Sequence, residues 1–425
     1  MQKAIYIIGA GLLGKRMIDW AREAGAAVIV TDKNECAPGF SRADAHAVID
    51  GTDKKGHLAF VKKLEKIYQI AGVYCGNEFG AWTVYELSRA LGLEMNTKDA
   101  IHATLDKTVM KKMWEEAHIF TPMLLDAKSA SQHEMIIVKP AVGSGSRGVS
   151  VVSGNEVESA VVYARNAVPE NSEVVIEEYV EGRHIDANGV WLGGTFYPCG
   201  VLERFFTPLP DRLPMGGYDP ANIPEEEKNI VYELLKKSSR ALGITFGPVK
   251  GDFIRKPNGE YVVLEVAFRF HGDVSSVNNL PFGSNINPLK FYFHYIMTGD
   301  IHLSYIKPEK SRYAMWRVIC APPGIVKEIP DTKRGADEYI ISVWLNERCA
   351  REIPRYRNNA YIPGLICAYG DTKQGAENAL KRYFEGNAYS VIFNEKEKEW
   401  YRNLGGALRA HNFSLQACGY DESVL

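Results

Sequence analysis

The chain has 425 residues, of which 46% are hydrophobic and 24% are charged, a composition typical of globular proteins that excludes a disordered or collagen-like chain. Its 50 Lys and Arg residues against 52 Asp and Glu residues give a net charge of −2, which excludes a global basic field for nucleic acid or an anionic membrane. The length predicts about three domains. Scattered cysteines without a C-x-x-C pair, no apolar run long enough to span a bilayer and no signal peptide predict a cytoplasmic protein with reduced thiols.

The first hundred residues alternate short β-branched runs with segments of helical spacing. The predicted strands cover residues 4–8, 27–31, 48–49 and 72–75, and the predicted helices cover residues 12–24, 58–70 and 82–91. This alternation predicts βαβ units and a parallel sheet. Gly9-x-Gly11-x-x-Gly14 follows the first strand and Asp32 lies at the end of the second, which is the context of a dinucleotide-binding fingerprint. The same loop also occurs in sheets that bind other ligands or none.

The rest of the chain mixes helices with further strands. Helices are predicted over residues 97–122, 155–167, 225–242 and 372–384, and strands over residues 135–138, 149–152, 173–180, 314–320, 339–344 and 365–369. Two more strands are predicted on either side of Pro257-Asn258-Gly259, because Asn-Gly is a strong signal for a two-residue hairpin turn.

A glycine-rich loop follows the strand that ends in Lys139. It contains Gly143, Ser144, Gly145, Ser146, Arg147 and Gly148. A loop of this kind offers many backbone amides and hydroxyls to anionic oxygens, and a lysine beside it supplies a point charge for phosphates. It is not a P-loop, because no Gly-Lys-Ser/Thr opens a helix here. The alternative interpretation is an ordinary hairpin loop with a solvated lysine.

Two carboxylates are predicted to face each other across the later hairpin. A turn at Asn258-Gly259 pairs Asp252 with Glu265, which would place their Cβ atoms about 4.5–5.5 Å apart on one face. Like charges so placed destabilise a sheet unless a cation lies between them, and converging carboxylate oxygens suit Mg²⁺ held jointly by phosphates. Arg269 should lie on the same face and could stabilise a transferring phosphoryl group. The alternatives are two acids on a solvated face and a salt bridge from Arg269 to one of them.

Taken in order, these residues resemble the ATP-grasp superfamily, in the carboxylate–amine ligase branch that also contains biotin carboxylase and the carbamoyl-phosphate synthase halves. The resemblance implies an α/β fold. A Rossmann-like domain would cover residues 1–96, and an ATP-grasp domain would cover residues 97–305, with a lid subdomain at about 123–182. A small C-terminal α+β segment over residues 306–425 would close the site.

The resemblance also assigns roles to individual residues. It places Lys107 and Lys139 on the phosphates, makes the glycine-rich loop a lid, and assigns the catalytic roles to Arg269 and Lys139. Its nucleotide-contacting positions further include Glu177, Glu178 and Val180 near adenine and His184 and Asp186 near the ribose. Asp252 and Glu265 match the magnesium ligands, although Ala267 stands where the family often has an asparagine ligand.

The implied function is an ATP- and Mg²⁺-dependent ligase, with Mn²⁺ as an alternative ion, that activates a carboxylate as an acyl phosphate and joins it to an amine. A carboxylase that uses bicarbonate, a nicotinamide-dependent oxidoreductase built on the N-terminal glycines and a non-catalytic ATP-binding protein are the alternatives. The expected partners are small-molecule acids and amines, not nucleic acid or a membrane, and a homodimer is compatible with this interpretation. Arg204 in segment 204–217, together with Asn77 and Glu78, is predicted to contact substrate, with ordinary loop packing as the alternative.

Overall fold

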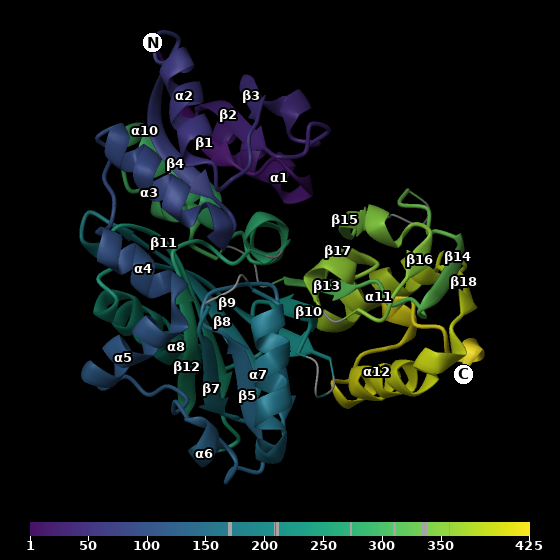
Figure 1. The fold of residues 1–425 in the computed structure, drawn as a ribbon. Helices are drawn as coiled ribbons and strands as arrows, with labels where there is room; N and C mark the ends of the chain where they lie inside the picture. The colour runs from purple at the N-terminus through teal and green to yellow at the C-terminus, as the bar shows by residue number, and fades with distance from the viewer. Residues whose placement is uncertain are drawn as a thin grey trace.

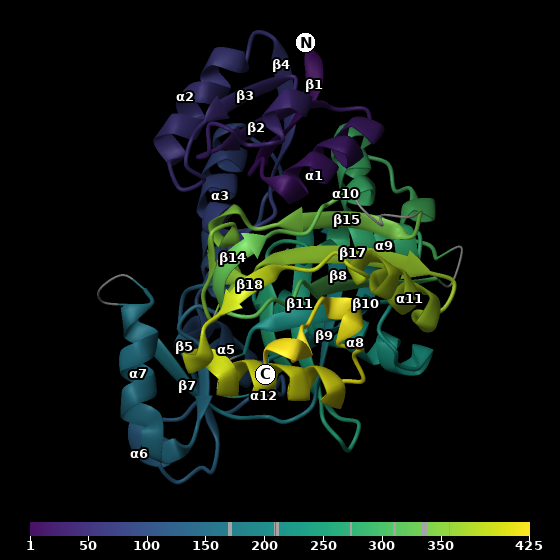
Figure 2. The same ribbon diagram turned by 90° about the vertical axis from the view of Figure 1, so that its right-hand side faces the viewer.

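The computed structural model describes residues 1–168, 172–207, 209, 212–272, 274–308, 312–333, 338–356 and 358–425. Its N-terminal sheet lies above a large central sheet, with the C-terminal part of the chain to one side (Figure 1). A quarter turn shows that β5 (Ile136–Pro140) and β7 (Val174–Glu178), with α6 (Ala127–Ala130) and α7 (Val157–Asn166) beside them, project from the end of the molecule opposite the N-terminal sheet (Figure 2). Within the described residues, every helix is too short or too polar to traverse a lipid bilayer.

The N-terminal sheet is parallel, as the alternation of strands and helices predicts. Its strands, in spatial order, are β3 (Ala45–Val48), β2 (Ala27–Asp32), β1 (Gln2–Ile8) and β4 (Tyr68–Cys75), and its helices are α1 (Leu12–Glu23), α2 (Lys54–Leu64) and α3 (Ala81–Ala90). The predicted helix over residues 58–70 is wrong at its C-terminal end, where the chain is already in β4. β4 begins early because Tyr68 already pairs with Gln2 at the start of β1, where the backbone N–H and C=O groups need hydrogen-bond partners.

A small antiparallel sheet carries the predicted lid loop. Its strands are β6 (Ser150–Val152), β5 (Ile136–Pro140) and β7 (Val174–Glu178), and α6 (Ala127–Ala130) and α7 (Val157–Asn166) lie beside it.

The predicted helix over residues 97–122 is two helices, α4 (Lys98–Leu105) and α5 (Lys107–Glu116). Asp106 separates them, because its side chain accepts hydrogen bonds from the amides of Thr108 and Val109 and so caps α5.

The central sheet has eight antiparallel strands and carries most of the side chains discussed below. In spatial order they are β12 (Tyr261–Ala267), β11 (Gly247–Arg255), β8 (Arg183–Leu192), β9 (Thr195–Phe206), β10 (Pro214–Asp219), β13 (Tyr313–Val318), β17 (Gly364–Gly370) and β15 (Ile340–Leu345). The sequence analysis misses β8, β9 and β10, because eight consecutive buried residues in β8 show no alternation between an apolar and a polar face.

Helices cover the central sheet, and the C-terminal part of the chain adds a further small sheet. The helices are α8 (Glu225–Ala241), α9 (Leu280–Gly283), α10 (Pro288–Thr298), α11 (Lys373–Phe384) and α12 (Lys398–Ala410), and the small sheet contains β16 (Glu352–Ile353), β14 (Gly324–Glu328) and β18 (Ser390–Phe393). Apolar side chains such as Val231 and Leu235 anchor α8 to the core between the helix and the sheet. The layers therefore hold the strands rigidly in place.

The hairpin of β11 and β12 pairs Asp252 with Glu265, as predicted, but by a different route. The predicted two-residue turn is wrong: the amide of Lys256 donates to the carbonyl of Glu260 at 2.8 Å, so the loop has three residues. Gly259 takes a φ of +88°, which glycine adopts without strain. A bulge then leaves Leu264 without a cross-strand partner, and this extra residue restores the predicted pairing.

Candidate active site

A cavity of about 220 Å³ lies between the central sheet and the glycine-rich loop, and we call it the small cavity. Seven cationic side chains line it, namely Lys107, Lys139, Arg147, Arg204, Arg212, Lys250 and Arg269. Three carboxylates line it as well, namely Glu78, Asp252 and Glu265. Ile137, Val149 and Leu264 add apolar surface. This excess of cationic side chains would neutralise the charge of a polyanion such as a nucleoside triphosphate.

The two acids predicted to face each other do so, and a lysine lies between them. The ammonium nitrogen Nζ of Lys250 is 2.8 Å from Asp252 Oδ2 and 3.5 Å from Glu265 Oε1. Lys107 Nζ approaches Glu265 Oε2, also at 3.5 Å. Burial acts to raise the pKa of Glu265, but Lys107 and Lys250 outweigh it and lower the pKa to about 2. Both oxygens of Glu265 therefore face cations as an ionised carboxylate.

Asp252 is also held as a carboxylate. Burial would raise the pKa of Asp252, but Lys250 and Arg204 hold it well below its usual range. Arg204 Nη2 lies 3.1 Å from Asp252 Oδ2 and also forms an ion pair with Asp186. Arg204, predicted to contact substrate, thus neutralises two acids at the wall of the small cavity.

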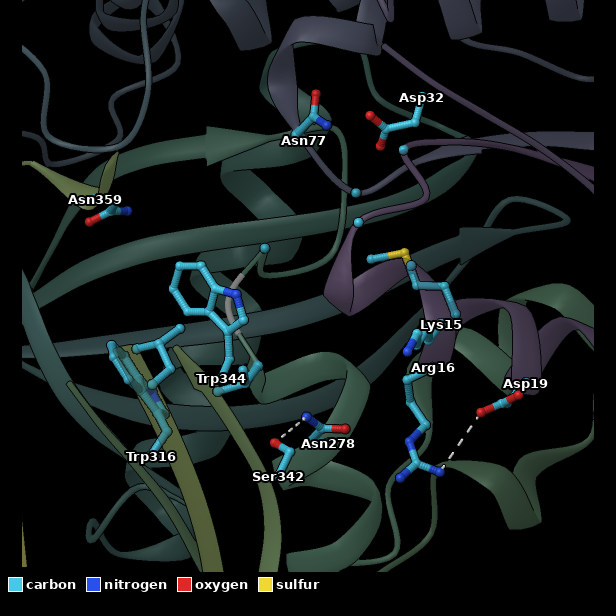
Figure 3. Close-up of a pocket in the computed structure, with 18 of the residues that line it drawn as sticks. Lys15, Arg16, Asp19, Asp32, Asn77, Asn278, Trp316, Ser342, Trp344 and Asn359 are labelled. Atoms are coloured by element: carbon cyan, nitrogen blue, oxygen red, sulfur yellow. Dashed lines mark hydrogen bonds and ion pairs between the residues drawn. The ribbon is translucent and has the colours of Figure 1, made fainter. Parts of the chain in front are cut away.

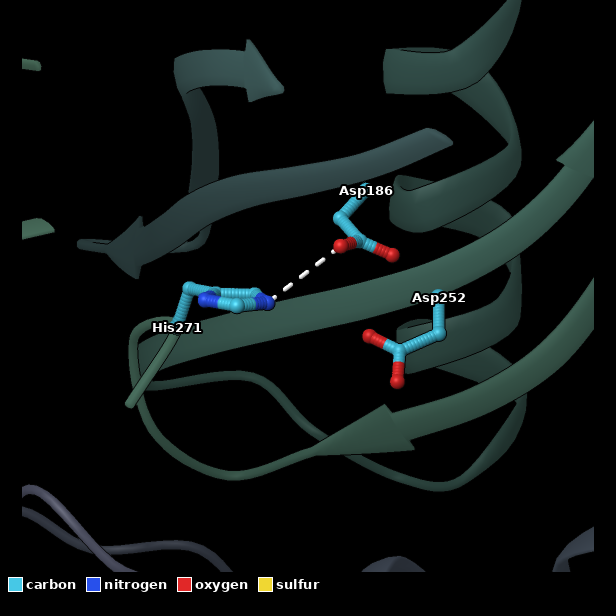
Figure 4. Close-up of side chains that lie close together, drawn as sticks. All are labelled: Asp186, Asp252 and His271. Carbon is cyan, nitrogen blue, oxygen red and sulfur yellow. Dashed lines mark ion pairs between the residues drawn. The ribbon is translucent and has the colours of Figure 1, made fainter. Parts of the chain in front are cut away.

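Asp186, Asp252 and His271 form a compact group whose ligand-type atoms lie within 4.8 Å of one another (Figure 4). His271 Nε2 is 3.3 Å from Asp186 Oδ2. Oxygen and imidazole donors at this spacing could hold a cation. Arg204 already pairs with both carboxylates, however, which partly neutralises the negative charge that would attract an ion here.

Lys139 lies over a buried carboxylate behind the cavity wall. Its Nζ is 2.9 Å from Glu177 Oε1, and Lys111 Nζ is 3.3 Å from the same atom. Burial alone would raise the pKa of Glu177, but the two lysines outweigh it and lower the pKa. Glu177 is only 1% exposed, so it orients Lys139 rather than reaching into the cavity.

Arg269 reaches the small cavity but does not pair with either hairpin acid. Its Nη2 donates to Glu78 Oε1 at 2.5 Å. The alternative prediction was a salt bridge from Arg269 to Asp252 or Glu265. Arg269 does form a salt bridge, but its partner is Glu78. Glu78 lies before α3 of the N-terminal sheet domain, so this pair joins that domain to the hairpin.

The glycine-rich loop crosses the small cavity with a distinctive backbone. Gly145, Ser146 and Gly148 all have φ values between 58° and 70°, in the left-handed region that favours glycine. Lys107 donates to the carbonyl of Gly143 at 3.1 Å, and Ser146 Oγ donates to the carbonyl of Arg212 at 2.8 Å. These contacts hold the loop over the cavity by polar groups, with few apolar anchors.

His184, predicted to lie near the ribose, lines the same cavity. Arg212 donates to its Nε2, and the ring packs on Phe206 with 4.2 Å between the ring centroids. Burial and the charges of Arg212 and Arg204 hold the pKa of His184 well below its ordinary value. The imidazole is therefore a neutral acceptor.

Most predicted site residues meet in the small cavity, but some do not. Those outside its lining are Gly148, Glu177, Glu178, Val180, Asp186 and Asn77. Glu178 instead accepts a hydrogen bond from the amide of Met123 at 3.1 Å, and Asn77 Oδ1 accepts one from the amide of Gly80. Segment 204–217 lies partly outside the described residues, at 208, 210 and 211. Its ends at Arg204, Phe206, Arg212 and Pro214 line the small cavity.

The sequence analysis missed Lys250 and Lys111, and it included Arg212 only as part of segment 204–217, without its contact to His184. Lys250 lies two residues before Asp252 in a strand, so the period of two was enough to place it on the same face. Lys111 lies four residues after Lys107 in α5 and therefore on the same side of the helix. No signal in the sequence brings Arg212 to His184, because that contact depends on the fold of the loop before β10.

A second cavity of about 750 Å³, the large cavity, adjoins the small one and shares Pro214, Gly272 and Asn359 with it. Figure 3 shows Trp316 and Trp344 on one side, opposite Lys15 and Arg16 of α1. The walls therefore combine an aromatic side with a charged side.

The N-terminal glycine motif borders the large cavity, but its residues have structural roles. Asp32 Oδ2 accepts the amide of Ala10 at 2.8 Å, and Oδ1 accepts the amide of Asn34 at 2.9 Å. A Cβ on Gly14 would lie 3.0 Å from the carbonyl oxygen of Gly9. Close packing explains Gly14 and a φ of +101° explains Gly9, whereas a Cβ on Gly11 would meet nothing within 4 Å. One oxygen of Asp32 thus holds the glycine loop and the other holds the loop after β2.

The donor set fits a magnesium ion. Asp252 and Glu265 are ionised carboxylates on one face of the hairpin, which are the hard oxygen ligands that Mg²⁺ takes together with substrate phosphates.

Known proteins share both the domain and the fold. The ATP-grasp domain family matches residues 104–273. A formate-dependent phosphoribosylglycinamide formyltransferase from Prochlorococcus marinus is 28% identical over 163 residues, which are 37% of this chain and 42% of that protein. The chain thus spans less than half of this curated relative's length.

Two solved structures have similar folds over nearly the whole chain. An L-amino acid ligase from Bacillus licheniformis has a TM-score of 0.76 at 16% identity and covers 93% of this chain and 100% of its own. A biotin carboxylase from Campylobacter jejuni has a TM-score of 0.70 at 18% identity and covers 97% of this chain and 98% of its own. Residues 104–273 thus form an ATP-grasp domain, and the chain as a whole shares its fold with these two enzymes.

Proposed function

We propose that the chain is an ATP- and Mg²⁺-dependent ligase that activates a carboxylate as an acyl phosphate and joins it to an amine. The observation that carries this proposal is the junction of the two cavities at Pro214, Gly272 and Asn359. An acid in the large cavity would reach the terminal phosphate of ATP in the small cavity without passing through solvent. The similarity to an L-amino acid ligase and to a formyltransferase named as formate-dependent supports the same class of reaction.

The chemistry requires two displacements. An oxygen of the carboxylate attacks the γ-phosphorus, the bond from that phosphorus to the β-phosphate oxygen breaks, and ADP leaves. The amine nitrogen then attacks the acyl carbon, phosphate leaves with its oxygen, and the nitrogen loses a proton to give the amide. Lys107 and Lys139 would bind the phosphates, and Arg269 would neutralise charge at the transferring group.

Asp252 and Glu265 would hold Mg²⁺, or Mn²⁺ in its place, which when bound neutralises phosphate charge. The glycine-rich loop would close over the nucleotide and keep water from the acyl phosphate. The assignment of Glu177, Glu178 and Val180 to the adenine and of His184 and Asp186 to the ribose stays a prediction, as do the domain boundaries. Arg204, Glu78 and Asn77 stay predicted substrate contacts.

The large cavity has room for an organic substrate. Its volume of about 750 Å³ is within the range of about 300–1,000 Å³ of ligand pockets. An organic acid beside an amine would contact both Trp316 and Trp344, as would the organic acceptor of a carboxylase, so the assay below decides between the two reactions.

An ADP-release screen of carboxylic acids crossed with amino acids tests the proposal. Without bicarbonate, the right pair should release ADP, and hydroxylamine should trap the hydroxamate of that acid. ADP release that depends strictly on bicarbonate, with no hydroxamate from any organic acid, would establish the carboxylase alternative instead.

A further inference from the structure

Lys250 lies in the middle of the carboxylate pair, and the hairpin leaves room for it there. It is 4% exposed and pairs across the hairpin with Ala267. Directly paired residues have neighbouring side chains on the same face, and the methyl group of Ala267 takes little of that space. The lysine side chain therefore extends over Ala267 to the two acids.

The two carboxylates differ in how tightly cations hold them. Lys250 Nζ donates to both oxygens of Asp252, at 2.9 and 2.8 Å, and Arg204 adds a contact of 3.1 Å. Around Glu265 both lysine contacts are 3.5 Å long. Asp252 thus has its cations in hydrogen-bond contact, while Glu265 keeps the more available oxygens.

The charge around the small cavity also limits how many metal ions it needs. Seven Lys and Arg side chains line it against three carboxylates, and one of those, Glu78, is paired with Arg269. A divalent ion is attracted where carboxylates exceed cations, and here the cations are in excess. A triphosphate that enters with one ion is neutralised by lysines and arginines already present.

We propose that the Lys250 ammonium is a fixed cation that occupies one position between Asp252 and Glu265, so that the nucleotide site takes one divalent ion instead of two. The second ion that a pair of facing acids could bind is replaced by a group of the chain itself. This inference rests on the nucleotide binding that the proposed function includes, and it does not depend on which acid and amine are joined.

Counting bound Mn²⁺ tests the proposal directly. The full chain is titrated with Mn²⁺ at saturating β,γ-imido-ATP, and electron paramagnetic resonance of the free ion gives the number bound per chain. Wild type should bind one Mn²⁺. Lys250→Met, which keeps the length and removes the charge, should bind two, and Lys250→Arg should bind one. Two ions in wild type, or one in a nucleotide-binding Lys250→Met variant, would overturn the inference.

Two further variants test whether the position of the Lys250 charge matters, or only the loss of one positive charge. Lys107→Met removes a cation at the same 3.5 Å from Glu265 but away from Asp252. Its affinity for the nucleotide should fall, because Lys107 is proposed to bind phosphate, but once saturated with nucleotide it should still bind one Mn²⁺. Lys236→Met removes an exposed lysine paired with Glu233 and should match wild type. Two ions in Lys107→Met would show that any lost charge admits a metal, which contradicts a specific role for Lys250. If Lys250→Met is unfolded, two ions in wild type would still overturn the inference, and Lys250→Gln would replace the methionine variant in the count. Failure of wild type to bind the nucleotide would instead contradict the proposed function itself.

Discussion

The two adjoining cavities differ in volume and in the chemistry of their walls. The small cavity, of about 220 Å³, is bounded by lysines and arginines whose positions are fixed by buried acids such as Glu177 and Asp186. The large cavity, of about 750 Å³, is bounded by Trp316, Trp344 and the start of α1. Phosphate binding requires preorganised charge, whereas recognition of an organic substrate requires shape and apolar surface.

This difference explains why the two cavities are not equally informative about function. The ion pairs of the small cavity identify the chemistry at the phosphates, which ATP-dependent ligases and carboxylases have in common. The walls of the large cavity would select the substrate, and they contain residues from both ends of the chain. Five experiments test this division, beginning with the largest expected effect.

The buried carboxylate of Glu177, which pairs with Lys111 and Lys139 behind the small cavity, should be essential to the stability of the fold. Glu177→Gln removes the carboxylate that two buried lysines share, and breaking a buried ion pair in this way costs about 3–5 kcal/mol. Urea unfolding monitored by fluorescence should show this loss. Glu158→Gln, on the exposed side of α7, should be unchanged. Equal midpoints for Glu177→Gln and wild type would mean that the lysines do not depend on this acid.

The stability of the same variant should also depend on pH differently from that of wild type. The pKa of Glu177 is lowered in the folded chain, so its contribution to stability is present above its unfolded pKa of about 4.3 and is lost as the pH falls through the lower folded value. Wild type should therefore lose more stability than Glu177→Gln on acidification below about pH 4. Parallel acid unfolding curves would contradict this linkage.

The chemistry of the small cavity should depend on Glu265. Glu265→Gln keeps the shape but removes a charged oxygen ligand, and we expect ADP release to fall by about 10²–10³-fold. Circular dichroism should show an unchanged fold. Glu260→Gln, at the exposed tip of the same hairpin, is the matched control. Wild-type turnover in a folded Glu265→Gln variant would remove this acid from the site.

The large cavity should affect only the organic substrate. Trp344→Ala should raise the KM for the acid or amine found in the screen by about tenfold or more, with the KM for ATP unchanged. The measurement is ADP release at varied concentrations of each substrate. If both KM values rise together, the two cavities do not have separate functions, and the comparison drawn above is wrong.

The glycine-rich loop should show the smallest effect, as a change in accessibility. Loops with few apolar anchors open at low free energy, so limited proteolysis of the apo protein should cut within residues 143–148. ATP with Mg²⁺ should slow this cleavage several-fold, while cleavage elsewhere keeps its rate. Equal rates with and without nucleotide would contradict a lid over the small cavity.

The sequence by itself determined the parallel N-terminal sheet, the order of the ATP-grasp motifs and the facing of Asp252 and Glu265. These features depend on local periodicity and on cross-strand register, which neighbouring residues specify. Even so, the register at the acids was predicted with the wrong turn, because a three-residue loop and a bulge at Leu264 compensate each other.

Only the tertiary structure decided the partners of the charges. Arg269 pairs with Glu78, 191 residues away, and Arg204 joins Asp186 to Asp252. The strand β8, which carries Asp186, is buried over eight consecutive residues, and β10 is buried throughout, so neither shows an alternating pattern. The large cavity likewise combines α1 with β13 and β15. Such contacts form between segments far apart in the chain, where local preference carries no information about the partner and only packing in the folded protein selects it.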